Sequence, residues 1–593
     1  MPLVSSLNRS TPTLFSVFVA FAVCALLNLA AWWWFNCPVV LPLSFDEPLS
    51  SVSFAPYRRG QNPLTMVYPS PAQVEEDLAS LVGIARGIRT YTSREGLAEV
   101  PQLARKYGFT LTQGAWLTVP YQLDGTPTYN ELELSALIRS AQSYPDVVRR
   151  VIVGNEVLLR GELTPAQLID YIRRVKAAVK QPVTYADVWA FFEKYPEVGR
   201  AVDFLTIHIL PYWEDEPVSL EQAAEHVVWV YRRIQGLFPG KPILIGEVGW
   251  PTQGRTRGPA PPTRENSARF LRTVARLARE NRFDYNWVEA FDQPWKSALE
   301  GTVGANWGVV DEQRRSKFGL DGPVVSNPEW RGQALSAVLA AVLLGVLGLW
   351  LRARGEAVRG RRYDTIELWR VMAMLQLLGS LVVIQAVYVC TISYTTIETW
   401  WAGLRIIPHV LLAGVIAVGM VAASRDSIVN SGTMLLGRRL MILYLVAAIF
   451  TTTLLLLDGR YRDIPTREFL IPGLGVTAYA VMRIRAGGAG WVQAFSLPNL
   501  FPGDPLHDPI SPRRTVIILW VAMGVGPLSE SWALSQGQDF LHLHSTWVER
   551  VPLLLYALVA NMEMLVWSAL LGVMAMPFLA QWYLARSQLP KSA

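Results

Sequence analysis

Long apolar stretches lie at both ends of this 593-residue chain, and a block rich in charge, residues 51–330, separates them. Charged residues make up only 17% of the whole chain, whereas about 25% is usual for a soluble protein. The shortfall falls in the apolar stretches, most of which approach the roughly 20 residues that cross a bilayer as a helix. This distribution predicts a membrane protein with one large domain outside the bilayer.

The N-terminal apolar stretch, residues 13–35, ends in three tryptophans and predicts an uncleaved transmembrane anchor within residues 1–44. A signal peptide is the weaker alternative, because the stretch is too long and lacks a clear small-residue cleavage site. The C-terminal part, residues 329–593, predicts an all-α polytopic membrane domain of about seven helices. Its apolar segments are 334–351, 368–391, 402–423, 440–457, 469–482, 515–534 and 551–580.

Arginines between these segments predict how the chain is oriented. The loop 352–362 holds five arginines, and such clusters stay on the cytoplasmic side. With every segment crossing once, the chain makes eight crossings, both termini are inside, and residues 45–328 are outside. The weakest segment is 469–482, which is short, contains Pro472 and Gly473, and is expected to be re-entrant or broken if it does not cross. Glu563 is expected well inside the last segment, as an inward-facing polar contact.

The charged block alternates between strand-like and helix-like patterns. Amphipathic stretches separate eight strand-like runs, and about 30 residues per unit is typical of a (β/α)₈ TIM barrel, although a doubly wound open sheet is the alternative. The eight runs are 51–56, 85–91, 109–116, 151–155, 182–188, 203–209, 241–247 and 284–291. The predicted fold is an α/β barrel followed by the membrane domain.

Two of these runs end in glutamate. Val151–Asn155 leads into Glu156, and Ile243–Gly246 leads into Glu247, 91 residues further on. That spacing puts the glutamates three barrel units apart, with both at the catalytic face. A single glutamate at a strand end is usually a solvated charge, but such a pair is typical of enzymes that cut or transfer a glycosidic bond.

The pair predicts a retaining mechanism, with Glu247 as the nucleophile, Glu156 as the acid/base and Asn155 binding the sugar 2-hydroxyl. No metal or nucleotide site is expected, because the three cysteines and six histidines form no ligand cluster in the sequence, and no cofactor is predicted. The net charge of +6 is assigned to loops between membrane segments, so nucleic acid is not an expected partner.

The stretches Val153–Val157 and Gly246–Thr252 resemble the signature strands of glycoside hydrolase family 17, the β-1,3-glucanases and β-1,3-glucanosyltransferases. Arg89-Thr90-Tyr91 is similar to the segment whose tyrosine lies in that family's active site. The stretch 291–296 resembles its eighth-strand segment, where Lys296 is retained but Gln293 replaces a frequent glutamate. The resemblance covers about residues 50–325 and implies a (β/α)₈ barrel, a retaining mechanism and a β-glucan substrate.

Aromatic residues near the strand ends fit a sugar cleft, because their faces complement the C–H faces of sugar rings. Trp250, directly after the nucleophile strand, is predicted to form a cleft wall. Tyr212 is predicted to contact substrate or to hydrogen-bond Glu247. His208 is as well explained as a satisfied strand-end histidine.

The expected function is a β-1,3-glucan transglycosylase of an inner membrane, with its barrel in the periplasm, that elongates, branches through β-1,6 links or cyclises glucan. Anchorage favours transfer beside a membrane glucan synthase, so β-glucan, the lipid bilayer and such a synthase are the expected partners. A tethered endo-β-1,3-glucanase is the first alternative. A glucan export or assembly protein with a merely binding barrel is the second.

Overall fold

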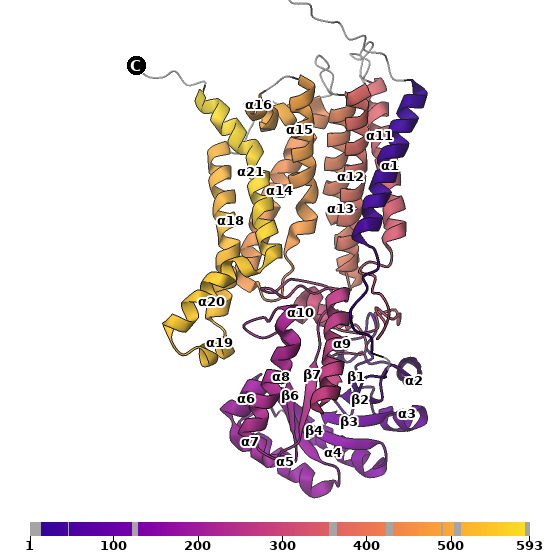
Figure 1. Cartoon of the computed structure of the whole chain (residues 1–593), viewed down its shortest axis with the longest axis vertical. Helices are drawn as coiled ribbons and strands as arrows, with labels where there is room; N and C mark the ends of the chain where they lie inside the picture. The colour runs from indigo at the N-terminus through magenta and orange to yellow at the C-terminus, as the bar shows by residue number, and fades with distance from the viewer. Residues whose placement is uncertain are drawn as a thin grey trace, which may run out of the picture.

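The computed structural model describes residues 13–45, 47–120, 128–354, 365–422, 431–487, 490–502 and 511–587. Most of the expected cytoplasmic arginine loop, residues 355–362, lies outside the described residues. Figure 1 shows two parts: a barrel with its surrounding helices, and a bundle of long helices beside it.

Eight parallel strands close into a barrel in sequence order, which confirms the predicted fold and excludes the open sheet. Each predicted run overlaps one of them, although β4 begins three residues before its run and β7 ends one residue after its run. The strands are β1 (Val52–Ser53), β2 (Gly87–Thr90), β3 (Thr110–Ala115), β4 (Val148–Asn155), β5 (Val183–Val188), β6 (Leu205–His208), β7 (Ile243–Val248) and β8 (Asp284–Trp287). β1 pairs with β8 through Val52 and Trp287 and completes the ring.

Helices cover the outside of the barrel and bury apolar side chains against it, such as Leu137, Ile172, Val227 and Val274. Two of them begin with a proline after a capping box, at Ser70 and Thr164, which explains where they start. The longer barrel helices are α2 (Pro71–Ser80), α3 (Val100–Tyr107), α4 (Tyr129–Ser143), α5 (Pro165–Ala178), α8 (Leu220–Leu237), α9 (Arg264–Asn281) and α10 (Ser297–Gly304), and the short α6 (Trp189–Lys194) and α7 (Pro196–Ala201) lie between β5 and β6.

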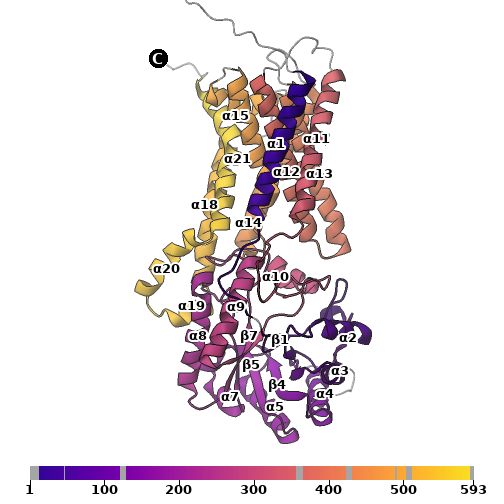
Figure 2. The ribbon, with the colours of Figure 1, turned by 45° about the vertical axis from the view of Figure 1, so that its right-hand side comes forward.

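Within the residues that the structure describes, seven helices are long and apolar enough to cross a membrane. They are α1 (Leu14–Phe35), α11 (Trp330–Arg354), α12 (Thr365–Thr391), α13 (Thr396–Ala422), α14 (Ser431–Asp458), α18 (Pro512–Ser535) and α21 (Met562–Ser587). The start of α1 and the end of α21 lie at the same end of the bundle, away from the barrel (Figures 1 and 2).

The weak segment 469–482 is broken in the structure. It consists of the 3₁₀ turn η3 (Pro465–Phe469), the π turn η4 (Ile471–Gly475) and the short helix α15 (Val476–Gly487). Asp463, just before η3, contacts Thr302 of the barrel, whereas α15 and the following α16 (Trp491–Phe495) lie at the far end of the bundle. The broken segment therefore carries the chain from the barrel end of the bundle to its far end, as an eighth crossing would. The four-residue helix α17 (Leu497–Leu500) follows α16.

The last apolar segment, expected as one stretch over 551–580, is two helices. α20 (Trp547–Ala560) ends at Asn561, and α21 begins at Met562. Glu563 is therefore in the first turn of α21 and accepts a hydrogen bond from the backbone N–H of Thr256 in the barrel at 2.9 Å. The expectation that Glu563 lies deep in a membrane segment is wrong, because the helix starts only one residue before it.

The carboxyl ends of the strands face the bundle. The loop after β6 binds Arg460, the loop after β7 contacts Arg462, Glu530 and Glu563, and α10 after β8 contacts Asp463. The short helix α19 (Gln538–Leu543) also reaches the barrel, since the backbone N–H of Asp539 donates to Asp215 at 2.9 Å. The face of the barrel that carries active sites in this fold thus lies against the bundle (Figures 1 and 2).

Candidate active site

A cleft of about 2450 Å³ opens at the carboxyl ends of the strands, and both Glu156 and Glu247 line it. Pockets for single small molecules measure about 300–1,000 Å³, so this cleft has room for an oligomer. Asn155, Tyr91 and Lys296, which the sequence analysis assigned to substrate binding, also line it. The cleft runs from the barrel to the ends of the long apolar helices α14 and α18.

The strands place the two glutamates at one site. Glu247 lies within β7 and its side chain is almost buried, whereas Glu156 follows β4 directly. Glu156 has a positive φ of 53°, an uncommon conformation for a residue with a side chain. Such conformations cluster at functional sites, because the surrounding structure has to hold them in place.

Arg89 is the centre of the hydrogen-bond network. It lies on β2 with its side chain buried, and its Nη1 donates to the carbonyl of Gly246 at 2.6 Å and to Glu247 Oε1 at 3.2 Å. Its Nη2 donates to the side-chain oxygen of Asn155. One guanidinium therefore ties β2 to β4 and β7 and places a positive charge beside Glu247.

Tyr91 and His208 complete the surroundings of the two carboxylates. The Tyr91 hydroxyl donates to Glu247 Oε1 at 3.0 Å, and His208 lies between the glutamates, with Nδ1 2.7 Å from Glu156 Oε1 and Nε2 3.5 Å from Glu247 Oε1. Burial and the charge of Glu247 raise the pKa of Tyr91 far above its usual value, so its hydroxyl keeps its proton and donates.

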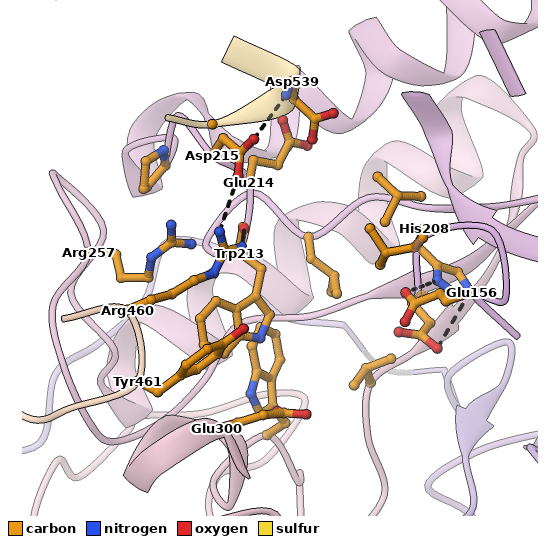
Figure 3. A pocket seen from close by; sticks show the side chains of 18 of the residues that line it. Glu156, His208, Trp213, Glu214, Asp215, Arg257, Glu300, Arg460, Tyr461 and Asp539 are labelled. Atoms are coloured by element: carbon orange, nitrogen blue, oxygen red, sulfur yellow. Dashed lines mark hydrogen bonds and ion pairs between the residues drawn. The ribbon is translucent and has the colours of Figure 1, made fainter. Parts of the chain in front are cut away.

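His208 also sets the ionisation of Glu156 (Figure 3). Burial raises the pKa of the Glu156 carboxyl, but the hydrogen bond and charge of His208, together with the charges of Arg160 and Arg89, outweigh burial and bring that pKa below its usual value. The sequence left His208 open between a residue of the sugar cleft and a satisfied strand-end histidine; in the structure its ring nitrogens face the two glutamates of the site.

Oxygen or nitrogen atoms of Glu156, His208 and Glu247 all lie within 4.8 Å of one another, a spacing that a metal ion can bridge. The Arg89 guanidinium, however, is 3.2 Å from Glu247 and 3.4 Å from His208 Nε2. A fixed positive charge among the ligand atoms opposes a second cation, so the residues fit an arginine-neutralised carboxylate site better than a metal centre.

Lys296 has a buried partner that the sequence analysis missed. Its Nζ lies 3.1 Å from Oε1 of Glu289, which follows β8 and is fully buried. Burial raises the pKa of Glu289 to about 7, although the charge of Lys296 lowers it. Gln293, which replaces a glutamate frequent in the resembling family, is buried. Its side-chain NH₂ donates to the Ala55 carbonyl, and its side-chain oxygen accepts from Trp295 Nε1 at 2.9 Å.

Two predicted contacts are corrected by the structure. Trp250 is fully buried in the barrel core, where its Nε1 donates to the Pro261 carbonyl at 3.1 Å, so it forms no cleft wall. Tyr212 is also fully buried, and its hydroxyl donates to the Arg255 carbonyl, not to Glu247. The neighbouring Trp213 lines the cleft instead.

The sequence of the barrel part is similar to a known family and to named proteins. Residues 51–308 match the family model described as the BtgE/BtgC glycoside hydrolase domain. A glucan 1,3-beta-glucosidase of Arthroderma benhamiae is 28% identical over 274 residues, which cover 42% of this chain and 84% of the relative. A glucan 1,3-beta-glucosidase of Schizosaccharomyces pombe is 29% identical over 262 residues, which cover 41% of this chain and 79% of the relative.

Among solved structures, the glycoside hydrolase family 17 β-1,3-glucanosyltransferase from Rhizomucor miehei is 28% identical, with a TM-score of 0.39 and coverage of 45% of this chain and 95% of that one. The bundle of long apolar helices lies outside the matched residues 51–308. The family model thus identifies residues 51–308 as a glycoside hydrolase domain of the BtgE/BtgC type, and both relatives similar to these residues are named glucan 1,3-beta-glucosidases.

Proposed function

We propose that the barrel cuts β-1,3-glucan by a retaining mechanism and passes the cut chain to the hydroxyl of another sugar. The observation that carries this proposal is the approach of Glu156 and Glu247, whose nearest carboxylate oxygens lie within 4.8 Å. Retaining glycosidases hold their carboxyls roughly 5–5.5 Å apart, whereas inverting enzymes need about 6.5–9.5 Å to fit a water between them.

In the first step, a Glu247 oxygen attacks the anomeric carbon, and the bond from that carbon to the glycosidic oxygen breaks. The leaving oxygen takes the proton that Glu156 shares with His208. Arg89 and Tyr91 hold the Glu247 carboxylate in position for this attack, because both donate hydrogen bonds to it.

In the second step, an acceptor hydroxyl gives its proton to Glu156 and attacks the anomeric carbon, which frees Glu247. The NH₂ group of Asn155 is placed to donate to the sugar 2-hydroxyl, since Arg89 already binds the amide oxygen. Lys296 lines the same cleft and donates to a further sugar hydroxyl in this proposal.

The membrane bundle supports transfer over hydrolysis. A hydrolase that degrades free glucan needs no fixed position, whereas a transferase that remodels a chain as it leaves a synthase benefits from being held beside it. We therefore place the protein in an inner membrane, with residues 45–328 in the periplasm, the bundle in the lipid bilayer and a membrane glucan synthase as its partner. Elongation, β-1,6 branching and cyclisation are the products to look for.

Product analysis tests this function. The full-length protein is incubated with a defined β-1,3-gluco-oligosaccharide, and products are resolved by mass and linkage. Products longer than the substrate, or with new β-1,6 links, are expected. If the products were shorter than the substrate at every substrate concentration, the reaction would be hydrolysis and not transfer.

Two variants test the mechanism. Glu247→Gln and Glu156→Gln should each lose turnover and keep glucan binding, and the matched surface variant Glu131→Gln, which breaks only an exposed ion pair with Arg174, should keep both. The new linkage of the transfer product should have the β configuration of the substrate in proton NMR. An α linkage would contradict the retaining mechanism.

A further inference from the structure

The glucan cleft has walls from two parts of the chain. Beside the barrel residues, it is lined by the last turns of α14 and α18, the loop after α14 through Tyr461, and α19. These segments lie outside the matched glycoside hydrolase residues 51–308, so a barrel alone would have a shorter cleft on this side.

Tyr461 and Trp213 form an aromatic corner in this part of the cleft. Trp213 is stacked on Trp307, with ring centroids 6.3 Å apart and planes at 21°, and the Tyr461 ring lies 5.9 Å from Trp213 at 60°. Both Trp213 and Tyr461 line the cleft, and Tyr461 is 40% exposed. Figure 3 shows the pair to one side of Glu156 and His208.

Arg460 holds this corner in place. Its Nη2 donates to the Trp213 carbonyl at 2.9 Å, and its Nη1 lies 3.2 Å from Asp215 Oδ1. Asp215 also accepts from the backbone N–H of Asp539 at 2.9 Å, so two separate segments of the membrane part bind one loop of the barrel. Arg257 covers the Trp213 ring at 5.2 Å from its centroid.

We propose that Tyr461, with Trp213, forms a sugar-binding subsite shared between the barrel and the membrane bundle, which takes a glucosyl unit of the β-1,3-glucan chain remote from the bond that is cut. Arg460 is a positioning residue for this subsite. The chemistry fits, because an exposed aromatic corner beside charged side chains binds the C–H face of a sugar and its hydroxyl rim. The inference rests on the function proposed above. It adds that a segment outside the barrel selects the length of glucan chain that is bound.

If Tyr461 had a purely structural role, its loss would lower kcat/KM equally for substrates of every length. The loss of a sugar-binding subsite would lower kcat/KM only for chains long enough to reach Tyr461, and this difference gives the test. The full-length protein and its Tyr461→Ala variant are compared on β-1,3-gluco-oligosaccharides of two to eight units, with kcat/KM measured at each length. Tyr583→Ala is the matched control, because Tyr583 is an exposed tyrosine on α21 that does not line the cleft.

We expect the wild type to gain kcat/KM at one step of chain length that Tyr461→Ala lacks. The variant should lose about 3- to 10-fold on longer chains, the size of one ring contact, and nothing on shorter ones. Tyr461→Trp should restore the gain. An equal loss at every length, or no loss at any length, would overturn the subsite.

Binding separates this inference from the function on which it rests. Affinities of the same oligosaccharides are measured for Glu247→Gln and for Glu247→Gln with Tyr461→Ala. A length-dependent loss supports the subsite even if the wild type proves inactive, which would count against the catalytic proposal alone. Absence of glucan binding in Glu247→Gln would overturn both.

Discussion

Arg89 and Glu247 meet across the barrel: the guanidinium on β2 donates to the carboxylate on β7 at 3.2 Å, and both side chains are almost fully enclosed. A buried carboxylate needs such a partner to remain an anion, because removal from water favours its neutral form. The proposed nucleophile thus depends on a strand far from it in sequence.

Arg89→Gln should lower kcat by about 10- to 100-fold, the value of a hydrogen bond between charged groups, and should also lower Tm, because Asn155 and the Gly246 carbonyl lose the same donor. Steady-state kinetics and thermal unfolding of the same samples check this. The exposed Arg105→Gln, which breaks a surface ion pair with Asp146, is the matched control and should change neither. Full activity in Arg89→Gln would remove the arginine from the mechanism.

Tyr91→Phe and Tyr212→Phe form a matched pair. Tyr91 donates to Glu247, whereas Tyr212 donates to a backbone carbonyl of the barrel. Loss of the Tyr91 hydroxyl should lower kcat by about 10-fold with little change in Tm, since one hydrogen bond contributes about 1 kcal/mol. Tyr212→Phe should leave kcat near the wild-type value. The opposite ranking of the two variants would restore the assignment made from the sequence.

Trp213→Ala and Trp250→Ala form a second matched pair, in which the first should mainly affect activity and the second should mainly affect stability. Trp213 lines the cleft and packs only partly against the core, so its loss should raise KM for long oligosaccharides and lower Tm less than Trp250→Ala does. Trp250 is a buried core residue, and its truncation should cost about 3–5 kcal/mol of unfolding free energy. Calorimetry beside kinetics distinguishes the two, and a stable Trp250→Ala with weakened glucan binding would contradict the core assignment.

Asp187 makes stability depend on pH. Burial and the charge of Glu156 raise the pKa of this carboxyl to about 7 in the folded protein, from about 3.9 in an unfolded chain. The folded state then binds the proton more tightly, so the stabilisation is complete below pH 4 and is lost as pH rises through 7.

Tm of the Asp187→Asn variant should therefore fall less than that of the wild type between pH 4 and 7. Asp146→Asn is the control, because Arg105 lowers the pKa of the exposed Asp146 carboxyl and removes it from this pH range. Identical slopes for the wild type and Asp187→Asn would show that Asp187 does not titrate there.

Metal chelation should leave turnover unchanged. Glu156, His208 and Glu247 are close enough for an ion, but Arg89 already supplies a positive charge among them. Activity is measured after dialysis against EDTA and after addition of divalent cations. A loss that one cation restores would replace the arginine-neutralised site with a metal centre.

The barrel was predictable because strand-like and helix-like stretches alternate regularly along the sequence, and each stretch can be recognised from neighbouring residues. Apolar runs end at Glu156 and Glu247, and strand order places such ends on one face of a closed sheet. Arg89 was missed because a charged residue within a short strand usually points to solvent, and only closure of the ring reveals that it points inward. Its neighbour Tyr91 was found by resemblance.

Tyr212 and Trp250 were misplaced because nearness in sequence to a catalytic strand does not fix the direction of a side chain. The division at Asn561 was missed for a different reason: the apolar composition continues through it, and asparagine is only a mild helix breaker. Contacts with the barrel at Thr256, which no local pattern records, accompany the break there.

The carboxyl ends of the strands face the bundle, so the cleft that holds Glu156 and Glu247 has the ends of α14 and α18 as part of its lining. A molecule bound at the two glutamates therefore lies between two parts of the chain, and residues far from the barrel in sequence share in selecting it.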